Sequence, residues 1–179
     1  MLKSSPFIVA LMGRARAEKV TREACAKACV PLIDGTLTDE YPALIEHLRL
    51  TAEITPSFIV RIVAHGKIDF FGALLSALTG NATTRVTTVL AGGRDVAVTA
   101  LLRSAGLAAG LHDVILVALK IWREVANDRR IAGAQEVSWL MLKALGERPN
   151  NELAGLIRSI HLETLRDNAR GHALAIAAA

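Results

Sequence analysis

Residues 56–107 constrain the fold most, because short apolar runs alternate there with glycine breaks. Apolar side chains recur at intervals of three and four residues, which is the spacing of one buried helix face. Within residues 69–79 this face is formed by Phe70, Phe71, Leu74, Leu75 and Leu78. Helices of about ten residues are marginal alone in water, so packing against neighbours must order them. The segment therefore predicts an array of short stacked helices.

Glycine breaks and capping residues divide the rest of the chain into further helices. Besides the helix that starts at Pro56, we expect helices over residues 16–29, 39–50, 69–79, 82–91, 95–105, 111–126, 134–145 and 152–169. We expect Gly80 to end one helix and Asn81 to cap the next. Residues 111–126 are apolar on most sides, which predicts that they form the central buried helix.

The composition favours one all-α domain. A chain of 179 residues, 52% of them hydrophobic, is long enough for one sizeable core. Aromatic residues make up only 4%, and alanine and leucine dominate, a mixture that favours helices over strands. We predict a single helical domain over residues 1–179, stacked as a HEAT-like or irregular array of about eight to ten helices.

Two helix starts are similar enough to indicate an internal repeat. Ser5-Pro6 and Thr55-Pro56 each place a capping hydroxyl before a proline at the first helical position. The tripeptide Phe-Ile-Val follows both, about fifty residues apart, near the period of solenoid units with two or three helices. Coincidence is the alternative for so short a match. The expected units are residues 5–54 and 55–107, followed by a C-terminal helical portion over residues 108–179.

Charge and cysteine spacing argue against several kinds of site. The net charge is +4, and acidic and basic residues are interspersed, as on solvated helix surfaces. Cys25 and Cys29 are the only cysteines, and a structural metal site would need further ligands nearby. We expect both to be core residues on a helix face shared with Ala17, Val20, Ala24, Ala28 and Leu32. Unpaired cysteines fit a cytoplasmic location.

The sequence predicts no membrane segment. A strong apolar run, residues 114–119, is closed by Asp113 and Lys120, so it is too short to span a bilayer. Near the N-terminus only residues 7–12 are continuously apolar, and Arg14 follows where a signal-peptide cleavage region is normally uncharged. We expect neither membrane insertion nor secretion.

The segment HGKIDFFGALLSALTG, with RVTTVLAGG and ALLRSAGL, resembles the carboxy-terminal region of an alphaproteobacterial family of HEAT-like helical repeat proteins, a domain of unknown function. In that family a helix ends in His-Gly, a Phe-Phe helix follows, and an arginine-containing helix leads to an Ala-Gly-Leu element. The resemblance covers residues 65–107 and extends over residues 55–63. The resemblance implies a helical repeat fold and an alphaproteobacterial origin. It does not point to any particular activity.

No motif predicts an enzyme, a metal or a cofactor. The chain has no Gly-x-Ser-x-Gly, phosphate loop or His-Glu-x-x-His. His65 and Asp69 lie at a helix junction, where capping accounts for both, and the pair His112-Asp113 has the same interpretation. The alternative is an enzyme whose site is assembled from dispersed residues and needs a pocket where at least two of them converge. These residues are His47, His65, Asp69 and His112.

Three arginines give the most specific functional hypothesis. Arg85, Arg94 and Arg103 recur nine residues apart across successive short helices, so stacking would bring them onto one face. Guanidinium groups bind carboxylates and phosphates bidentately, which predicts a partner-binding surface. The alternative is three independently solvated side chains.

Elimination favours a non-catalytic helical repeat module that binds another protein. Binding of nucleic acid or a phosphate-bearing ligand through a basic helical face is the alternative. Homo-oligomer formation also stays open, because Trp139, Leu142 and Leu162 fall off the predicted buried faces and would form an apolar patch.

Overall fold

The computed structural model describes residues 13–146 and 152–177, and all regular structure in these ranges is helical. Along the described residues, nine α-helices and one 3-10 helix follow one another: α2 (Arg14–Asp34), η1 (Thr38–Glu40), α3 (Tyr41–Leu50), α4 (Pro56–Ala64), α5 (Ile68–Thr79), α6 (Thr83–Gly92), α7 (Asp95–Ser104), α8 (Ala109–Ala126), α9 (Ala134–Leu145) and α10 (Glu152–Ala177). For the described residues, the prediction of an all-α stacked array is confirmed.

Two helices are longer than predicted. Helix α2 continues through Pro31 to Asp34, where Gly35 N–H bonds to the carbonyls of Pro31 and Leu32 at 3.2 Å each. Helix α10 continues through Gly171 to Ala177 instead of ending near residue 169, because the alanines on both sides of this glycine favour the helix. The repeat start at Ser5-Pro6 lies outside the described residues, so the repeat units stay a prediction.

The junction between α5 and α6 corrects one capping prediction. Gly80 ends α5 with a left-handed φ of 68°, as expected. Asn81 does not cap α6, because Ala82 occupies the N-cap position. Instead the carbonyl of Asn81 accepts a hydrogen bond from Ser76 Oγ at 2.6 Å. The turn is therefore fixed by a serine of the preceding helix.

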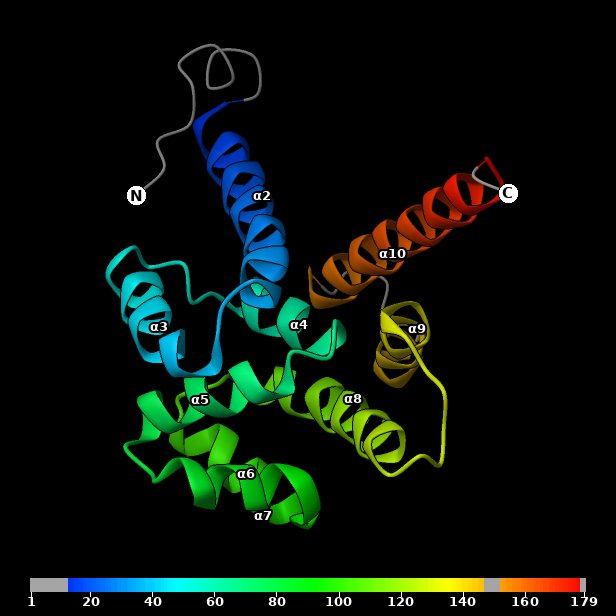
Figure 1. Cartoon of the computed structure of the whole chain (residues 1–179). Helices are drawn as coiled ribbons and strands as arrows, with labels where there is room; N and C mark the ends of the chain where they lie inside the picture. Colours follow the sequence, from blue (N-terminus) through cyan, green and yellow to red (C-terminus); the bar gives the residue numbers. More distant parts are fainter. Residues whose placement is uncertain (1–12, 147–151, 178–179) are drawn as a thin grey trace.

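Helix α4 is the central helix of the fold (Figure 1). It packs against α2, α5, α8, α9 and α10, and its last seven residues, Phe58 to Ala64, are all buried. Its predicted start is confirmed, since Thr55 accepts a hydrogen bond from Phe58 N at 3.2 Å and Pro56 follows the cap. The prediction of a central helix over residues 111–126 is wrong, because α8 exposes Asp113 and Lys120 along one side.

The buried face of α2 also differs from the predicted one. Ala17 is buried as expected, but Val20 and Leu32 are exposed. The residues that pack inward are Ala26, Val30 and Ile33. Alanines occur on both sides of this helix, so the apolar period alone does not distinguish the faces. Cys25 and Cys29 flank the buried face and are only partly buried.

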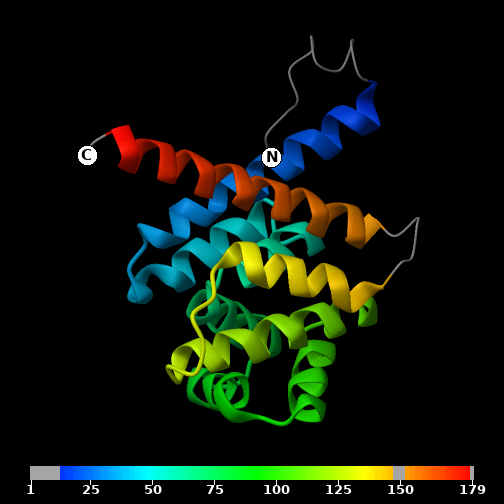
Figure 2. The same ribbon diagram turned by 90° about the vertical axis from the view of Figure 1, so that its right-hand side faces the viewer.

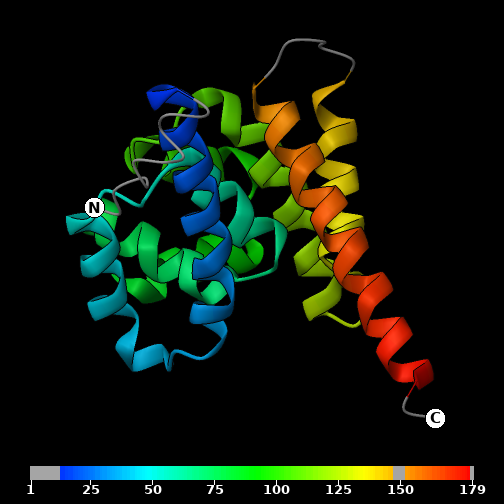
Figure 3. The ribbon, with the colours of Figure 1, turned by 90° about the horizontal axis from the view of Figure 1, so that it is seen from above.

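The helices stack from one end of the molecule to the other (Figure 2). Helices α8, α9 and α10 pack on one another in chain order, while α5, α6 and α7 form the end remote from α10. The C-terminal half of α10 extends past the other helices (Figure 3), and its side chains from Leu165 to Ile176 are exposed. Among the described helices, none has both the length and the apolar character needed to cross a bilayer.

The turn between α4 and α5 depends on Gly66 and Trp122. Gly66 has a φ of +74°, which an L side chain rarely adopts, and a Cβ there would lie 3.0 Å from the Trp122 ring. Trp122 Nε1 donates a hydrogen bond to the Val63 carbonyl at 2.8 Å, which satisfies an acceptor at the end of α4. Helix α8 is thus fixed directly to the central helix.

Replacement of Gly66 by alanine should lower the free energy of unfolding by about 2 kcal/mol, through backbone strain and displacement of Trp122. Gly80→Ala is the matched control, because Gly80 has a φ of +68° but no atom within 4 Å of an added Cβ. Gly80→Ala should lower the free energy of unfolding by about 1 kcal/mol, through backbone strain alone. Urea unfolding measures both, and equal losses would contradict the role of Trp122.

Candidate functional site

The dispersed residues proposed for an enzyme site do not meet in a described pocket. His47 is exposed on α3, while His112 is buried and its Nε2 lies 3.0 Å from the Leu107 carbonyl oxygen. His65 occupies the C-cap of α4, as the capping interpretation predicts. Asp69 lies in the first turn of α5, but Lys67 holds the N-cap position. Within residues 13–146 and 152–177, no cluster of three or more potential metal ligands occurs.

The cysteines show no sign of reactive chemistry. Burial raises the pKa of both Cys25 and Cys29, and the nearby carboxylate of Glu53 raises them further. Since the thiolate is the nucleophile and the metal ligand, both shifts oppose such roles.

The three arginines are exposed, at the end of the molecule remote from α10 (Figure 2). Arg85 lies in the first turn of α6, whereas Arg94 immediately precedes α7 and Arg103 lies in its last turn. Nine residues correspond to two and a half helical turns, or about 13 Å along the axis, so α7 presents Arg94 and Arg103 at opposite ends. No ion pair joins any of the three to another described residue. Their partner-binding role stays a prediction.

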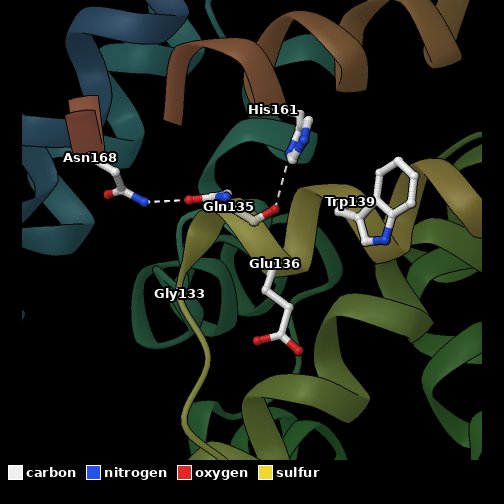
Figure 4. A pocket seen from close by; sticks show the side chains of 6 residues that line it. All are labelled: Gly133, Gln135, Glu136, Trp139, His161 and Asn168. Carbon is white, nitrogen blue, oxygen red and sulfur yellow. Dashed lines mark hydrogen bonds between the residues drawn. The ribbon is translucent and has the colours of Figure 1, made fainter. Parts of the chain in front are cut away.

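An open pocket of about 530 Å³ lies between the start of α9 and the middle of α10 (Figure 4). Its lining residues come from two neighbouring helices and the loop before them. They are Gly133, Gln135, Glu136, Trp139, His161 and Asn168. The pocket is therefore the candidate binding site that the described geometry offers.

His161 is held in a defined orientation inside this pocket. Its Nδ1 lies 3.1 Å from the carbonyl oxygen of Gln135 and 3.2 Å from Ser138 Oγ. A carbonyl only accepts, so the hydrogen of the neutral ring belongs on Nδ1 and Nε2 is left as an acceptor. The ring also packs against the Trp139 indole, with centroids 5.9 Å apart and planes tilted by 38°.

The remaining polar groups join the helices and give the pocket edge a negative charge. Asn168 Nδ2 donates to Gln135 Oε1 at 2.6 Å and so links α10 to α9. Glu136 pairs with Arg130, which also bonds to Glu124 at 3.0 Å. Both carboxylates raise the pKa of Arg130 through hydrogen bonds and charge. One guanidinium between two carboxylates leaves a net charge of −1 in this group.

A second polar cluster buries a charge between α4 and α10. Arg61 is only 2% exposed, and its Nη1 contacts Glu163 Oε2 at 2.5 Å. Lys27 of α2 lies 3.7 Å from the same carboxylate. Arg61 Nε is buried with no hydrogen-bond partner among the described residues. This cluster joins three helices, and it contains no pocket-lining residue.

Comparison with protein families gives a match over residues 2–149 of the 179-residue chain. The chain belongs to the DUF2336 family, described as uncharacterised proteins conserved in bacteria. No curated protein and no solved structure matches it. The DUF2336 match is wider than the resemblance over residues 55–107. It includes Gln135, Glu136 and Trp139 of the pocket but ends before α10.

Sequence reasoning named only one pocket residue, Trp139, and did so as part of an apolar patch. Trp139 and Leu162 are indeed exposed, while Leu142 is partly buried. Spacing signals for the pocket were present: Gln135 and Trp139 are four apart in α9, and His161 and Asn168 are seven apart in α10. Such signals place residues on one face of a helix. They do not show that these faces of α9 and α10 pack against each other in this DUF2336 protein, so the pocket could not be predicted.

Replacement of Glu163 by glutamine should lower the free energy of unfolding by about 3 kcal/mol near neutral pH, because the Arg61 charge stays buried without a counterion. Burial by itself raises the pKa of Glu163, but the hydrogen bond and charge of Arg61, with Lys27, hold it below the ordinary value. The stabilisation is therefore complete above about pH 4.3 and is lost as pH falls through the lowered pKa.

Urea unfolding between about pH 3 and pH 7 tests this prediction. The native chain should lose more stability on acidification than Glu163→Gln does. Glu46→Gln is the control, since its partner Arg49 is exposed and the pair contributes little. If the free energy of unfolding changed with pH in the same way for the native chain and for Glu163→Gln, the role of the buried pair would be contradicted.

A second pH effect should come from His65. Burial lowers its pKa, and so do the charges of Arg61 and Lys67, against the opposite effect of Glu163 and Asp167. The folded state therefore resists protonation of His65. The stability that the neutral ring contributes is complete above about pH 6.5, and this contribution is lost as pH falls through the lowered pKa. His65→Gln should remove this loss, and His47→Gln, an exposed control, should retain it. Urea unfolding at about pH 7 and about pH 5.5 gives the change in the free energy of unfolding between these two pH values. A change in His65→Gln as large as that in the native chain would refute the prediction.

Proposed function

We propose that this protein is a non-catalytic helical module that binds another protein. The observation that supports the proposal is the exposed end of α10. Every side chain described over residues 169–176 is exposed, including Leu174 at 71% and Ile176 at 78%. A helix end that buries no side chain gains little stability from propensity alone. A protein partner on this end would supply the missing apolar burial.

The proposal includes a HEAT-like repeat architecture, an alphaproteobacterial origin and a cytoplasmic location. The order of α8, α9 and α10, each packed on the next, is what stacked helical repeats would produce. The free thiols of Cys25 and Cys29 suit a reducing compartment.

The surface with Arg85, Arg94 and Arg103 is a second part of the proposal. Exposed guanidinium groups without an ion pair to described residues suit an acidic protein segment. The same property supports nucleic acid as the alternative ligand, which a steep salt dependence of binding would reveal. Because these helices lie far from α10 (Figure 2), variants at the two surfaces act separately.

A tagged pull-down from a bacterial lysate with mass spectrometry tests the proposal. The double variant Leu174→Glu/Ile176→Glu should reduce capture of a specific protein about tenfold or more, because it places charges on the apolar end of α10. The control Leu37→Glu/Leu50→Glu places charges on similarly exposed apolar residues before η1 and at the end of α3, at 66% and 73% exposure, and should retain capture.

The triple variant Arg85→Ala/Arg94→Ala/Arg103→Ala is the parallel arm for the basic surface. Loss of the captured protein in this arm alone would place the interface on α6 and α7. Capture that resists both the α10 variant and the arginine variant would refute both surfaces. Binding of DNA or RNA that weakens steeply with salt, and is lost in the triple variant, would replace a protein with nucleic acid as the ligand.

A further inference from the structure

We infer that the pocket between α9 and α10 binds a positively charged side chain, and that its ligand is an arginine of a protein partner. The inference rests on the proposed function for the source of the arginine. Binding of the guanidinium group itself depends only on the pocket. Three features of the pocket favour a guanidinium group: the charge at its edge, the hydrogen-bond acceptors inside it and the exposed indole.

The charge of the pocket favours a cation. Glu136 is the charged group among its lining residues, and its side chain is 41% exposed. Arg130 bonds to it but divides its charge between Glu136 and Glu124. A carboxylate has about four lone-pair sites, so Glu136 retains capacity for a second cationic donor. No lysine or arginine lines the described pocket, and the carboxylate of Glu136, which does line it, would repel a phosphate.

The hydrogen-bonding groups of the pocket include acceptors that lack a donor. With Nδ1 of His161 bonded to the Gln135 carbonyl, Nε2 is the remaining acceptor of the neutral ring. Asn168 uses its amide nitrogen on Gln135, and its Oδ1 has no donor among the described residues. A guanidinium has five donors and no acceptor, so it complements such a set better than an amide or a hydroxyl does.

The aromatic wall favours a flat, delocalised cation. Trp139 is 52% exposed, an unusual loss of burial for the largest apolar side chain. Indole is the best natural ring for cation–π contact, and guanidinium stacks on it because it is planar and weakly hydrated. The His161 ring against one part of the indole holds Trp139 in place. A lysine would gain the charge but not the stacking or the forked hydrogen bonds.

The test titrates the full chain with N-acetyl-arginine amide and follows the Trp139 indole N–H by NMR. We expect a dissociation constant on the order of 1 mM, as suits one side chain without the rest of a peptide. The citrulline analogue has nearly the same shape without the charge, and it should bind at least about tenfold more weakly. Added salt should weaken the arginine probe and leave the citrulline probe unchanged.

Two variants locate the site. Glu136→Gln should weaken the arginine probe about fivefold to tenfold, and Trp139→Leu should remove measurable binding, followed in that variant through the His161 ring signal. Glu152→Gln is the matched control, because this exposed carboxylate pairs with Lys19 and does not line the pocket. It should bind the probe as the native chain does.

Equal binding of the arginine and citrulline probes, or binding unaffected by Glu136→Gln, would overturn the inference. So would tighter binding of adenosine monophosphate than of the arginine probe, which would make the pocket a nucleotide site. The two proposals fail separately. Probe binding without any captured protein refutes the proposed function alone. A captured protein that is lost in Leu174→Glu/Ile176→Glu and retained in Trp139→Leu, with no probe binding, refutes the pocket alone.

Discussion

The buried charge of Arg61 is the constraint on which the arrangement of the helices depends. Arg61 lies in the middle of α4, where the neighbouring side chains are all buried, so its charge must be compensated inside the protein. Glu163 provides the compensation from α10, at a sequence separation of 102 residues. This pair fixes α10 over α4 and thereby determines which side of α10 faces α9. The pocket with His161 and Asn168 is a consequence of that placement.

Local signals in the sequence predicted where the helices lie, apart from the ends of α2 and α10, but they did not predict how the helices contact one another. Thr55 before Pro56, and the left-handed glycines Gly66 and Gly80, act within one turn of their own positions, so they predicted boundaries well. Burial depends on neighbours that the local pattern does not contain. Arg61 interrupts the apolar run of α4, so the sequence did not predict that its last seven residues are all buried. The many apolar residues between positions 111 and 126, in contrast, led to an overestimate of the burial of α8.

The same distinction explains the candidate site. Every pocket residue except Gly133 lies in a helix that the sequence predicted, but Asn168 and Gln135 meet only because α9 and α10 pack in one register. The arginines at positions 85, 94 and 103 share a regular spacing, yet a spacing of nine places two of them at opposite ends of α7. Regular spacing predicts a common surface only when it agrees with the helical repeat, as it does for His161 and Asn168.

Helix α10 is one uninterrupted element of 26 residues, about 39 Å long, which has a mechanical consequence. One part holds Glu163, His161 and Asn168 against the body of the protein, and the other extends freely into solvent (Figure 3). A continuous helix bends little, so a force on the free end would tilt the whole of α10 about its contact with Arg61. Because His161 and Asn168 lie in the same continuous helix, a partner that tilted the free end would also change the width of the pocket.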